Sequence, residues 1–160
     1  MLEIIEKNIV LSDSKYIAHQ CNCLTTDSAG VAKAIFNAFP YANTYRTRNY
    51  SHYKEAKDVP GTIEIFGDGK EKRYVINMYA QLFPGFPKIA ESTIDGYKAR
   101  EKSFEQCLDK ISEIDNIESI SFPYFIGCGL AHGNWENYEK MLEDFSNIIN
   151  GKVFLYKYER

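Results

Sequence analysis

The sequence has no long hydrophobic run, and this absence excludes one class of protein. No apolar stretch approaches the ~18 residues that a membrane-spanning helix needs. The first residues lack the basic and then apolar pattern of a secretory signal. The chain also carries no internal repeat, linker-like stretch or low-complexity tract. We therefore expect a single cytoplasmic domain over residues 1–160 that does not bind membranes.

Cysteine and histidine are scarce, with four cysteines and three histidines in the chain. Cys21 and Cys23 stand close together, but no second Cys/His pair follows at the spacing of a zinc site. Disulfides are not expected without a secretory signal. The sequence thus predicts reduced, largely buried thiols, no metal and no cofactor, with a metal site at the two neighbouring cysteines as the less favoured alternative.

A strong charge of one sign is also absent. The chain has 19 Lys and Arg against 22 Asp and Glu, a formal net charge of −3, which argues against the binding of nucleic acid over a broad surface. Residues 41–56 are a local exception, predicted to form an irregular helix in which tyrosines alternate with cationic side chains. Such a face can stack single-stranded bases, but a packed helix with solvated charges is the more common outcome.

Strand and helix patterns alternate along the chain. Apolar residues recur at helical spacing in three segments, and a Gly-Asp-Gly-Lys turn at 67–70 predicts an antiparallel hairpin. Together they predict an α/β protein, a three-layer α/β/α sandwich with a mixed, mostly parallel central sheet. The expected strands are 2–5, 16–21, 62–66, 73–81, 117–122 and 153–158, and the expected helices are 31–39, 93–114 and 135–149.

Two polar, glycine-containing loops each follow a predicted strand and precede a predicted helix. They are Asn22–Gly30 and the Gly-Cys-Gly segment within 127–133. Glycine lets backbone amides approach a ligand, and a helix N-terminus favours an anion. Because the carboxyl ends of parallel strands share one edge, we expect the two loops to flank one cleft, which the long loop 83–93 covers. A plain strand-to-helix turn is the alternative for the second loop.

In combination, these segments resemble the macro domain, the ADP-ribose-binding fold. Ile17–Asn22 with Ala29–Ala32 is similar to the first loop of that family, and Pro123–Gly133 is similar to its phosphate-binding loop. Val75–Asn77 resembles its central strand. The resemblance covers nearly the whole chain in the right order. It is closest to the branch with yeast ADP-ribose 1″-phosphate phosphatase, terminal ADP-ribose glutamate hydrolases and phage macro proteins.

The resemblance implies ADP-ribose or an ADP-ribosylated substrate as the partner. Asn22 would contact the distal ribose, and the amides of the second loop would hold the diphosphate. Asn8 and Ile9 stand where the family has an aspartate and an isoleucine beside adenine. The implied ligand-binding residues are Asn8, Ile9, Asn22, Gly30, Val31, Ala32, Gly127, Cys128, Gly129, Leu130, Ala131 and His132.

The sequence departs from the glutamate-hydrolase relatives at their catalytic positions. Met78 and Tyr79 occupy the part of the strand where their lysine stands, and Ala131 corresponds to their aspartate. A Schiff-base mechanism is therefore not expected.

The remaining candidates for catalysis are Asn22, His132 and His19, with Asp27 as an alternative base. Histidine transfers protons near neutral pH, so we expect water to attack at the distal end of bound ADP-ribose. The predicted function is an ADP-ribose 1″-phosphate phosphatase or an ADP-ribosyl hydrolase. The alternative is a non-catalytic reader of ADP-ribose.

Overall fold

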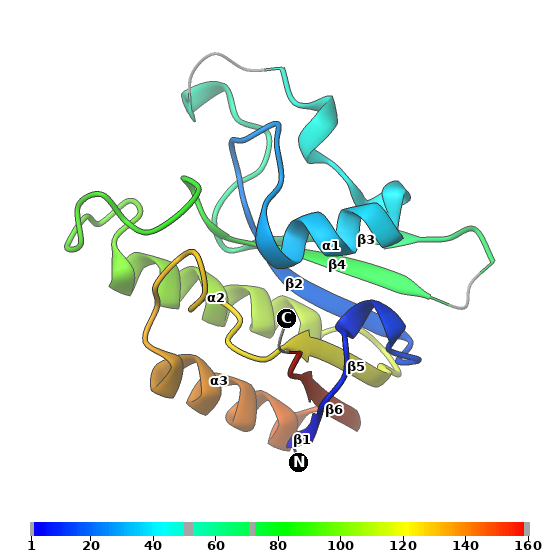
Figure 1. Ribbon diagram of the computed structural model, residues 1–160. Coiled ribbons are helices and arrows are strands. Elements are labelled where there is room, and N and C mark those ends of the chain that lie inside the picture. Colours follow the sequence, from blue (N-terminus) through cyan, green and yellow to red (C-terminus); the bar gives the residue numbers. More distant parts are fainter. Residues whose placement is uncertain (1, 50–52, 71–72, 159–160) are drawn as a thin grey trace.

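The structure is a computed structural model that describes residues 2–49, 53–70 and 73–158. A twisted sheet runs through the molecule with helices on both faces (Figure 1). Its strand order is β1-β6-β5-β2-β4-β3, and every neighbouring pair is parallel except β3 and β4. The predicted α/β sandwich with a mixed, mostly parallel sheet is confirmed. The strands are β1 (Leu2–Ile5), β2 (Tyr16–Asn22), β3 (Thr62–Gly67), β4 (Tyr74–Gln81), β5 (Glu118–Pro123) and β6 (Gly151–Tyr156).

Three helices cover the sheet: α1 (Gly30–Ala38) on one face, and α2 (Tyr97–Ser112) and α3 (Trp135–Ile148) on the other. Successive side chains of a strand point to opposite faces. Ala18 and Ile76 accordingly pack in the core beneath α2 and α3, whereas Ile17 and Val75 pack in the core beneath α1. Burial on both faces explains why the central strands read as nearly continuous apolar runs.

Two elements, α2 and β6, begin more than one residue away from their predicted starts. The helix α2 begins at Tyr97 rather than near residue 93, because the hydroxyl of Ser92 accepts the amides of Ile94 and Asp95 in a turn of its own. The strand β6 begins at Gly151, two residues early, where it pairs with Glu118. A side-chain cap begins α3, since Asn134 Oδ1 accepts the amide of Glu136 at 3.1 Å.

The helix predicted for residues 41–56 is wrong. The described parts of this segment contain short 3₁₀ helices, η2 (Pro40–Ala42), η3 (Tyr45–Thr47) and η4 (Tyr53–Glu55). The side chain of Asn43 accepts the amides of Tyr45 and Arg46, which competes with a continuous α-helix. Tyr50 and His52, part of the predicted aromatic and cationic face, lie outside the described residues.

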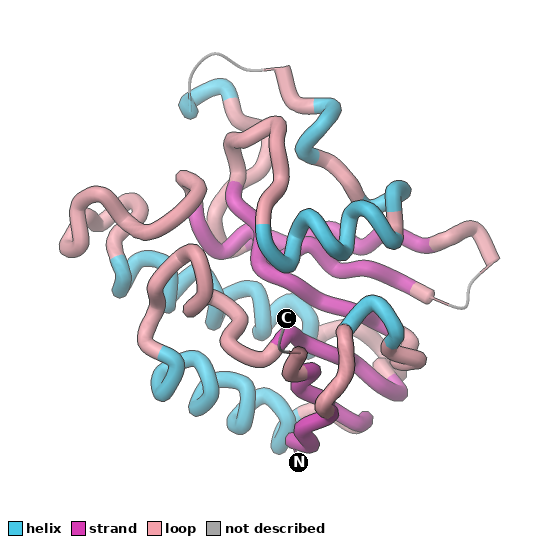
Figure 2. Tube along the Cα trace, in the orientation of Figure 1, coloured by secondary structure: helices cyan, strands magenta, loops and turns pink. Residues whose placement is uncertain are grey.

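The loops that follow β2, β4 and β5 leave the sheet at the same edge (Figure 2). Among the described residues, no helix is both long and apolar enough to cross a membrane. All four cysteines are free thiols, and only Cys128 is not fully buried. The candidate site lies at this edge of the sheet, among the loops that follow β2, β4 and β5.

Candidate functional site

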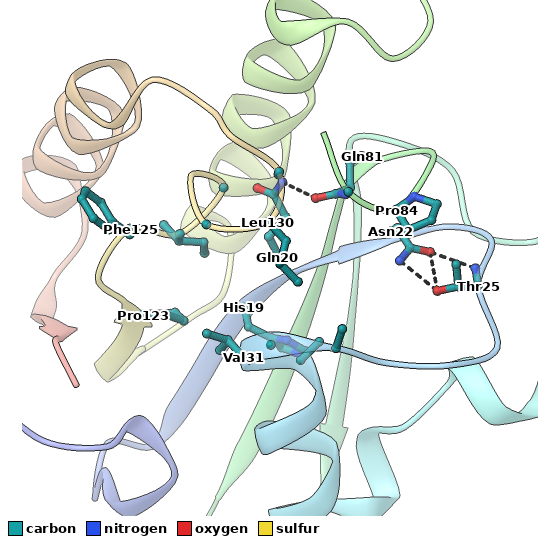
Figure 3. Close-up of a pocket in the computed structure, with 18 of the residues that line it drawn as sticks. His19, Gln20, Asn22, Thr25, Val31, Gln81, Pro84, Pro123, Phe125 and Leu130 are labelled. Atoms are coloured by element: carbon teal, nitrogen blue, oxygen red, sulfur yellow. Dashed lines mark hydrogen bonds between the residues drawn. The ribbon is translucent and has the colours of Figure 1, made fainter. Parts of the chain in front are cut away.

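A cavity of about 470 Å³ lies at the carboxyl ends of β2 and β5 (Figure 3). Both glycine-containing loops line it, and Pro84 and Gly85 of the long loop add to its wall. Of the residues expected at the site, Asn8, Ile9, Cys128 and His132 do not line the cavity. Those that line it are His19, Asn22, Gly30, Val31, Ala32, Gly127, Gly129, Leu130 and Ala131.

Asn22 ends β2, after a register shift that separates it from Cys21. Its Oδ1 accepts the amides of Leu24 and Thr25, each at 2.9 Å, and its Nδ2 donates to the hydroxyl of Thr25 at 3.0 Å. In Figure 3 the bonds to Thr25 tie the side chain to its own loop. The amide group of Asn22 therefore has one fixed orientation at the cavity wall.

The second loop offers unpaired backbone amides. Within the described part of the chain, the N–H groups of Gly127, Gly129, Leu130 and Ala131 donate to no protein acceptor, and all four residues line the cavity. Successive free amides form a concave anion site without any cationic side chain. Indeed, no lysine or arginine among the described residues lines this cavity.

Two bulky residues of this loop adopt a backbone conformation that favours glycine. Phe125 has φ of 66° and His132 has φ of 59°, a strain of order 1 kcal/mol or more for each residue. The His132 ring stacks on Phe86 of the long loop, with 5.3 Å between centroids and 21° between planes. The imidazole of His132 thus joins two loops beside the cavity rather than lining it.

His19 lies on β2 with only 1% of its surface exposed. Asn77 Nδ2 donates to the carbonyl of Ala42, so its Oδ1 faces His19 and accepts from His19 Nε2 at 2.7 Å. Burial lowers the pKa of His19 to about 4, against the opposing effect of the Asn77 hydrogen bond. His19 is therefore neutral at physiological pH and has its Nε2 proton committed to Asn77.

Cys128 and Asp27 are the remaining candidate side chains at the site. Burial raises the pKa of Cys128 to about 12, so this side chain is a protonated thiol and a poor nucleophile. Asp27 is exposed and lines the cavity. No group of three or more His, Cys, Asp or Glu side chains among the described residues could hold a metal ion.

Several residues that line the cavity were not predicted from the sequence. Gln20 Nε2 donates to Gln81 Oε1 at 2.7 Å, and Gln81 Nε2 donates to the carbonyl of Phe83 at 2.9 Å. This amide pair joins β2 and β4 in the lining of the cavity, as Figure 3 shows. Tyr45 lines the cavity from η3. Of these three residues, only Gln20 could have been found from the sequence, because it lies within the first-loop segment Ile17–Asn22. Tyr45 and Gln81 are brought to the cavity by the fold.

Comparisons with known proteins fit this geometry. A family model described as Macro domain matches residues 18–142. An uncharacterised 17.5 kDa protein from the tk-vs intergenic region of Enterobacteria phage T4 is 25% identical over 93% of this chain and 92% of its own length. A Bacteroides thetaiotaomicron protein of unknown function has a TM-score of 0.70 and 24% identity, over 98% of both chains. Thermosipho africanus DarTG in complex with ADP-ribose has a TM-score of 0.70 and 16% identity, over 98% of this chain and 41% of that one.

Proposed function

Because this chain belongs to the macro domain family, we propose that its cavity binds ADP-ribose or an ADP-ribosyl conjugate. The observation that carries the proposal is that the first loop and the free amides of the second loop line one cavity. Its volume of about 470 Å³ falls in the range of small-molecule sites. The Thermosipho africanus structure with bound ADP-ribose supports the same ligand class.

The proposed ligand lies along the cavity from the first loop to the second. Asn22, with Gly30, Val31 and Ala32 beside it, contacts the distal ribose, and the amides of the second loop hold the diphosphate. Asn8 and Ile9, which lie outside the cavity lining, are the proposed adenine contacts for the part of the ligand that extends beyond it. Asn8 Oδ1 already accepts the amide of Val10 at 3.3 Å, which leaves Nδ2 as a donor for an adenine ring nitrogen rather than for the exocyclic amine.

The finer proposal is hydrolysis of a group at the distal ribose, an ADP-ribose 1″-phosphate phosphatase or ADP-ribosyl hydrolase activity. Asn22 orients the ribose while water attacks. His19 is neutral with its proton committed, and His132 lies outside the cavity wall. Asp27 is the exposed carboxylate that lines the cavity, so it is the group best placed to take the proton of the water.

Calorimetry with ADP-ribose tests the binding step, and a flat titration would overturn it. Release of phosphate from ADP-ribose 1″-phosphate, and of ADP-ribose from an ADP-ribosylated protein, tests hydrolysis. Asp27→Asn should abolish turnover and leave binding intact, whereas Asp13→Asn, a matched change at an exposed position outside the cavity, should leave both unchanged. Equal turnover in the two variants would remove Asp27 from the mechanism.

A non-catalytic reader is the second candidate. The observation that favours it is that both histidines first expected to transfer protons are engaged elsewhere, His19 with Asn77 and His132 with Phe86. Saturable binding of ADP-ribose without release of any product from either substrate would establish this reading.

A further inference from the structure

Arg48 does not line the cavity, but its guanidinium bonds Asn22, which does. Its Nη1 donates to Asn22 Oδ1 at 3.2 Å and to the carbonyl of Thr25 at 2.9 Å. Its Nη2 donates to the carbonyl of Asn22 at 2.7 Å. A single guanidinium thus holds the side chain and the backbone of the residue proposed to contact the distal ribose.

The guanidinium is itself fixed. Asp58 accepts from Nη2 at 2.8 Å, and the side chains of the pair are 2% and 13% exposed. The Arg48 carbon Cζ lies 4.1 Å from the centroid of the Tyr45 ring, close enough for a cation–π contact. The Tyr45 hydroxyl accepts the amide of Asn22 at 2.7 Å. Arg48, Tyr45 and Asp58 therefore form one rigid support for the end of β2.

This support decides which atom of Asn22 can meet a ligand. Oδ1 receives hydrogen bonds from Leu24, Thr25 and Arg48, which uses its two lone pairs fully. Nδ2 gives one hydrogen to Thr25 and has a second hydrogen left. Asn22 consequently meets the cavity as a donor, which suits a ribose hydroxyl oxygen.

We propose that Arg48 is a positioning residue that holds the Asn22 amide in this donor orientation for the distal ribose. The proposal rests on ADP-ribose binding as proposed above. ADP contains the adenine and the diphosphate but no distal ribose, so it separates an effect that passes through Asn22 from a general loss of the site.

The test compares Arg48→Lys with Arg46→Lys, a matched change at an exposed position of η3. Lysine keeps the charge opposite Asp58 but lacks the planar fork that reaches Asn22 and Thr25 together. We expect Arg48→Lys to weaken ADP-ribose binding about tenfold, as one lost charge-assisted contact would, with ADP binding unchanged. Arg46→Lys should match the wild type for both ligands.

A double-mutant cycle with Asn22→Ala locates the effect. If Arg48 acts through Asn22, adding Arg48→Lys to Asn22→Ala should cause no further loss of ADP-ribose affinity. Equal losses for ADP and ADP-ribose, or additive losses in the cycle, would show a merely structural role and overturn the proposal. If Arg48→Lys does not fold, Asp58→Asn takes its place, because it removes the carboxylate that anchors Arg48. The same comparison of ADP-ribose with ADP then applies to Asp58→Asn.

Different results would overturn the proposed function and the positioning role of Arg48. A wild type that gives a flat titration with ADP-ribose overturns the proposed function and this inference with it. A wild type that binds, beside an Arg48→Lys variant that binds equally well, overturns the positioning role alone.

Discussion

Single residues of the second loop set how closely the backbone approaches the cavity. Gly127 has φ of 78°, and a Cβ atom there would lie 2.6 Å from the Tyr138 ring and 3.0 Å from Gln20 Oε1. Gly129, two residues on, has no heavy atom within 4 Å of such a Cβ. Packing and φ therefore exclude a side chain at Gly127, whereas a Cβ atom at Gly129 would meet no neighbouring atom.

This difference gives a matched pair of variants. Gly127→Ala should lower the free energy of unfolding by about 2–3 kcal/mol, since it adds overpacking to an unfavourable φ. Gly129→Ala should stay within about 0.5 kcal/mol of the wild type. Urea denaturation of both variants measures the contrast, and equal stabilities would show that the loop relaxes around the added methyl group.

His19 makes the stability of the fold depend on pH. Its pKa is lowered by burial to about 4, from 6.5 in the unfolded chain. Between these values the unfolded chain binds more protons, so the free energy of unfolding falls as the pH drops from 6.5 towards 4. The loss attributable to His19 is on the order of 3 kcal/mol.

Urea denaturation at several pH values, compared between wild type and His19→Gln, isolates this contribution from that of the carboxylates. The variant should show a shallower fall in stability over this window. His132→Gln, the same change at an exposed position, serves as the control for the substitution itself. A wild-type slope in His19→Gln would mean that another group accounts for the pH dependence.

At the scale of elements, a buried ion pair holds the long loop against the cavity. Arg100 of α2 bonds Asp95 through Nε at 3.1 Å and Nη2 at 2.7 Å, and donates to the carbonyls of Gly85 and Phe83. Asp95 in turn accepts the amides of Leu82 and Phe83. This network fixes the backbone of Pro84 and Gly85 as the cavity wall.

Breaking the pair should therefore affect both the stability of the fold and the local opening of the long loop. We expect Arg100→Ala to cost about 3–5 kcal/mol of unfolding free energy, because it leaves the Asp95 carboxylate buried without its partner. Amide hydrogen exchange over residues 82–86 should also become faster. Lys98→Ala, at an exposed position of the same helix, should change neither quantity. Unchanged exchange in Arg100→Ala would show that the loop is held by other contacts.

The helices and strands differ in how well they could be predicted from the sequence. Strands and helices with a clear apolar period were predicted within a few residues, because that period comes directly from burial. The segment 41–56 was misassigned, since a local bond from Asn43 to the amides of Tyr45 and Arg46 overrides a weak helical pattern. Arg48 was missed because it reaches Asn22 across 26 residues, a contact that only the folded loop defines.

At the scale of the whole molecule, the shared cleft was predictable and its internal chemistry was not. Parallel strands bring the loops after β2 and β5 to one edge whatever their side chains are. The orientation of the Asn22 amide and the commitment of the His19 proton depend on Arg48 and Asn77. These partners come from other elements, so no local pattern reveals them.

The charge of the molecule predicts an unusual salt dependence for a ligand with two phosphates. The chain has a formal net charge of −3, and no lysine or arginine in the described residues lines the cavity. The proposed diphosphate contacts are backbone amides, whose short-range dipoles are little affected by screening. The overall negative charge should repel the ligand slightly, and salt weakens that repulsion.

We therefore expect the dissociation constant of ADP-ribose to change less than about twofold between about 50 and about 500 mM NaCl, and any change to favour binding at the higher concentration. Calorimetry at the two concentrations measures it directly. A site that neutralised the phosphates with lysine or arginine would lose affinity steeply over this range, as nucleic-acid binding by cationic surfaces does. Such a loss would mean that cationic side chains, and not the amides of Gly127, Gly129, Leu130 and Ala131, hold the diphosphate.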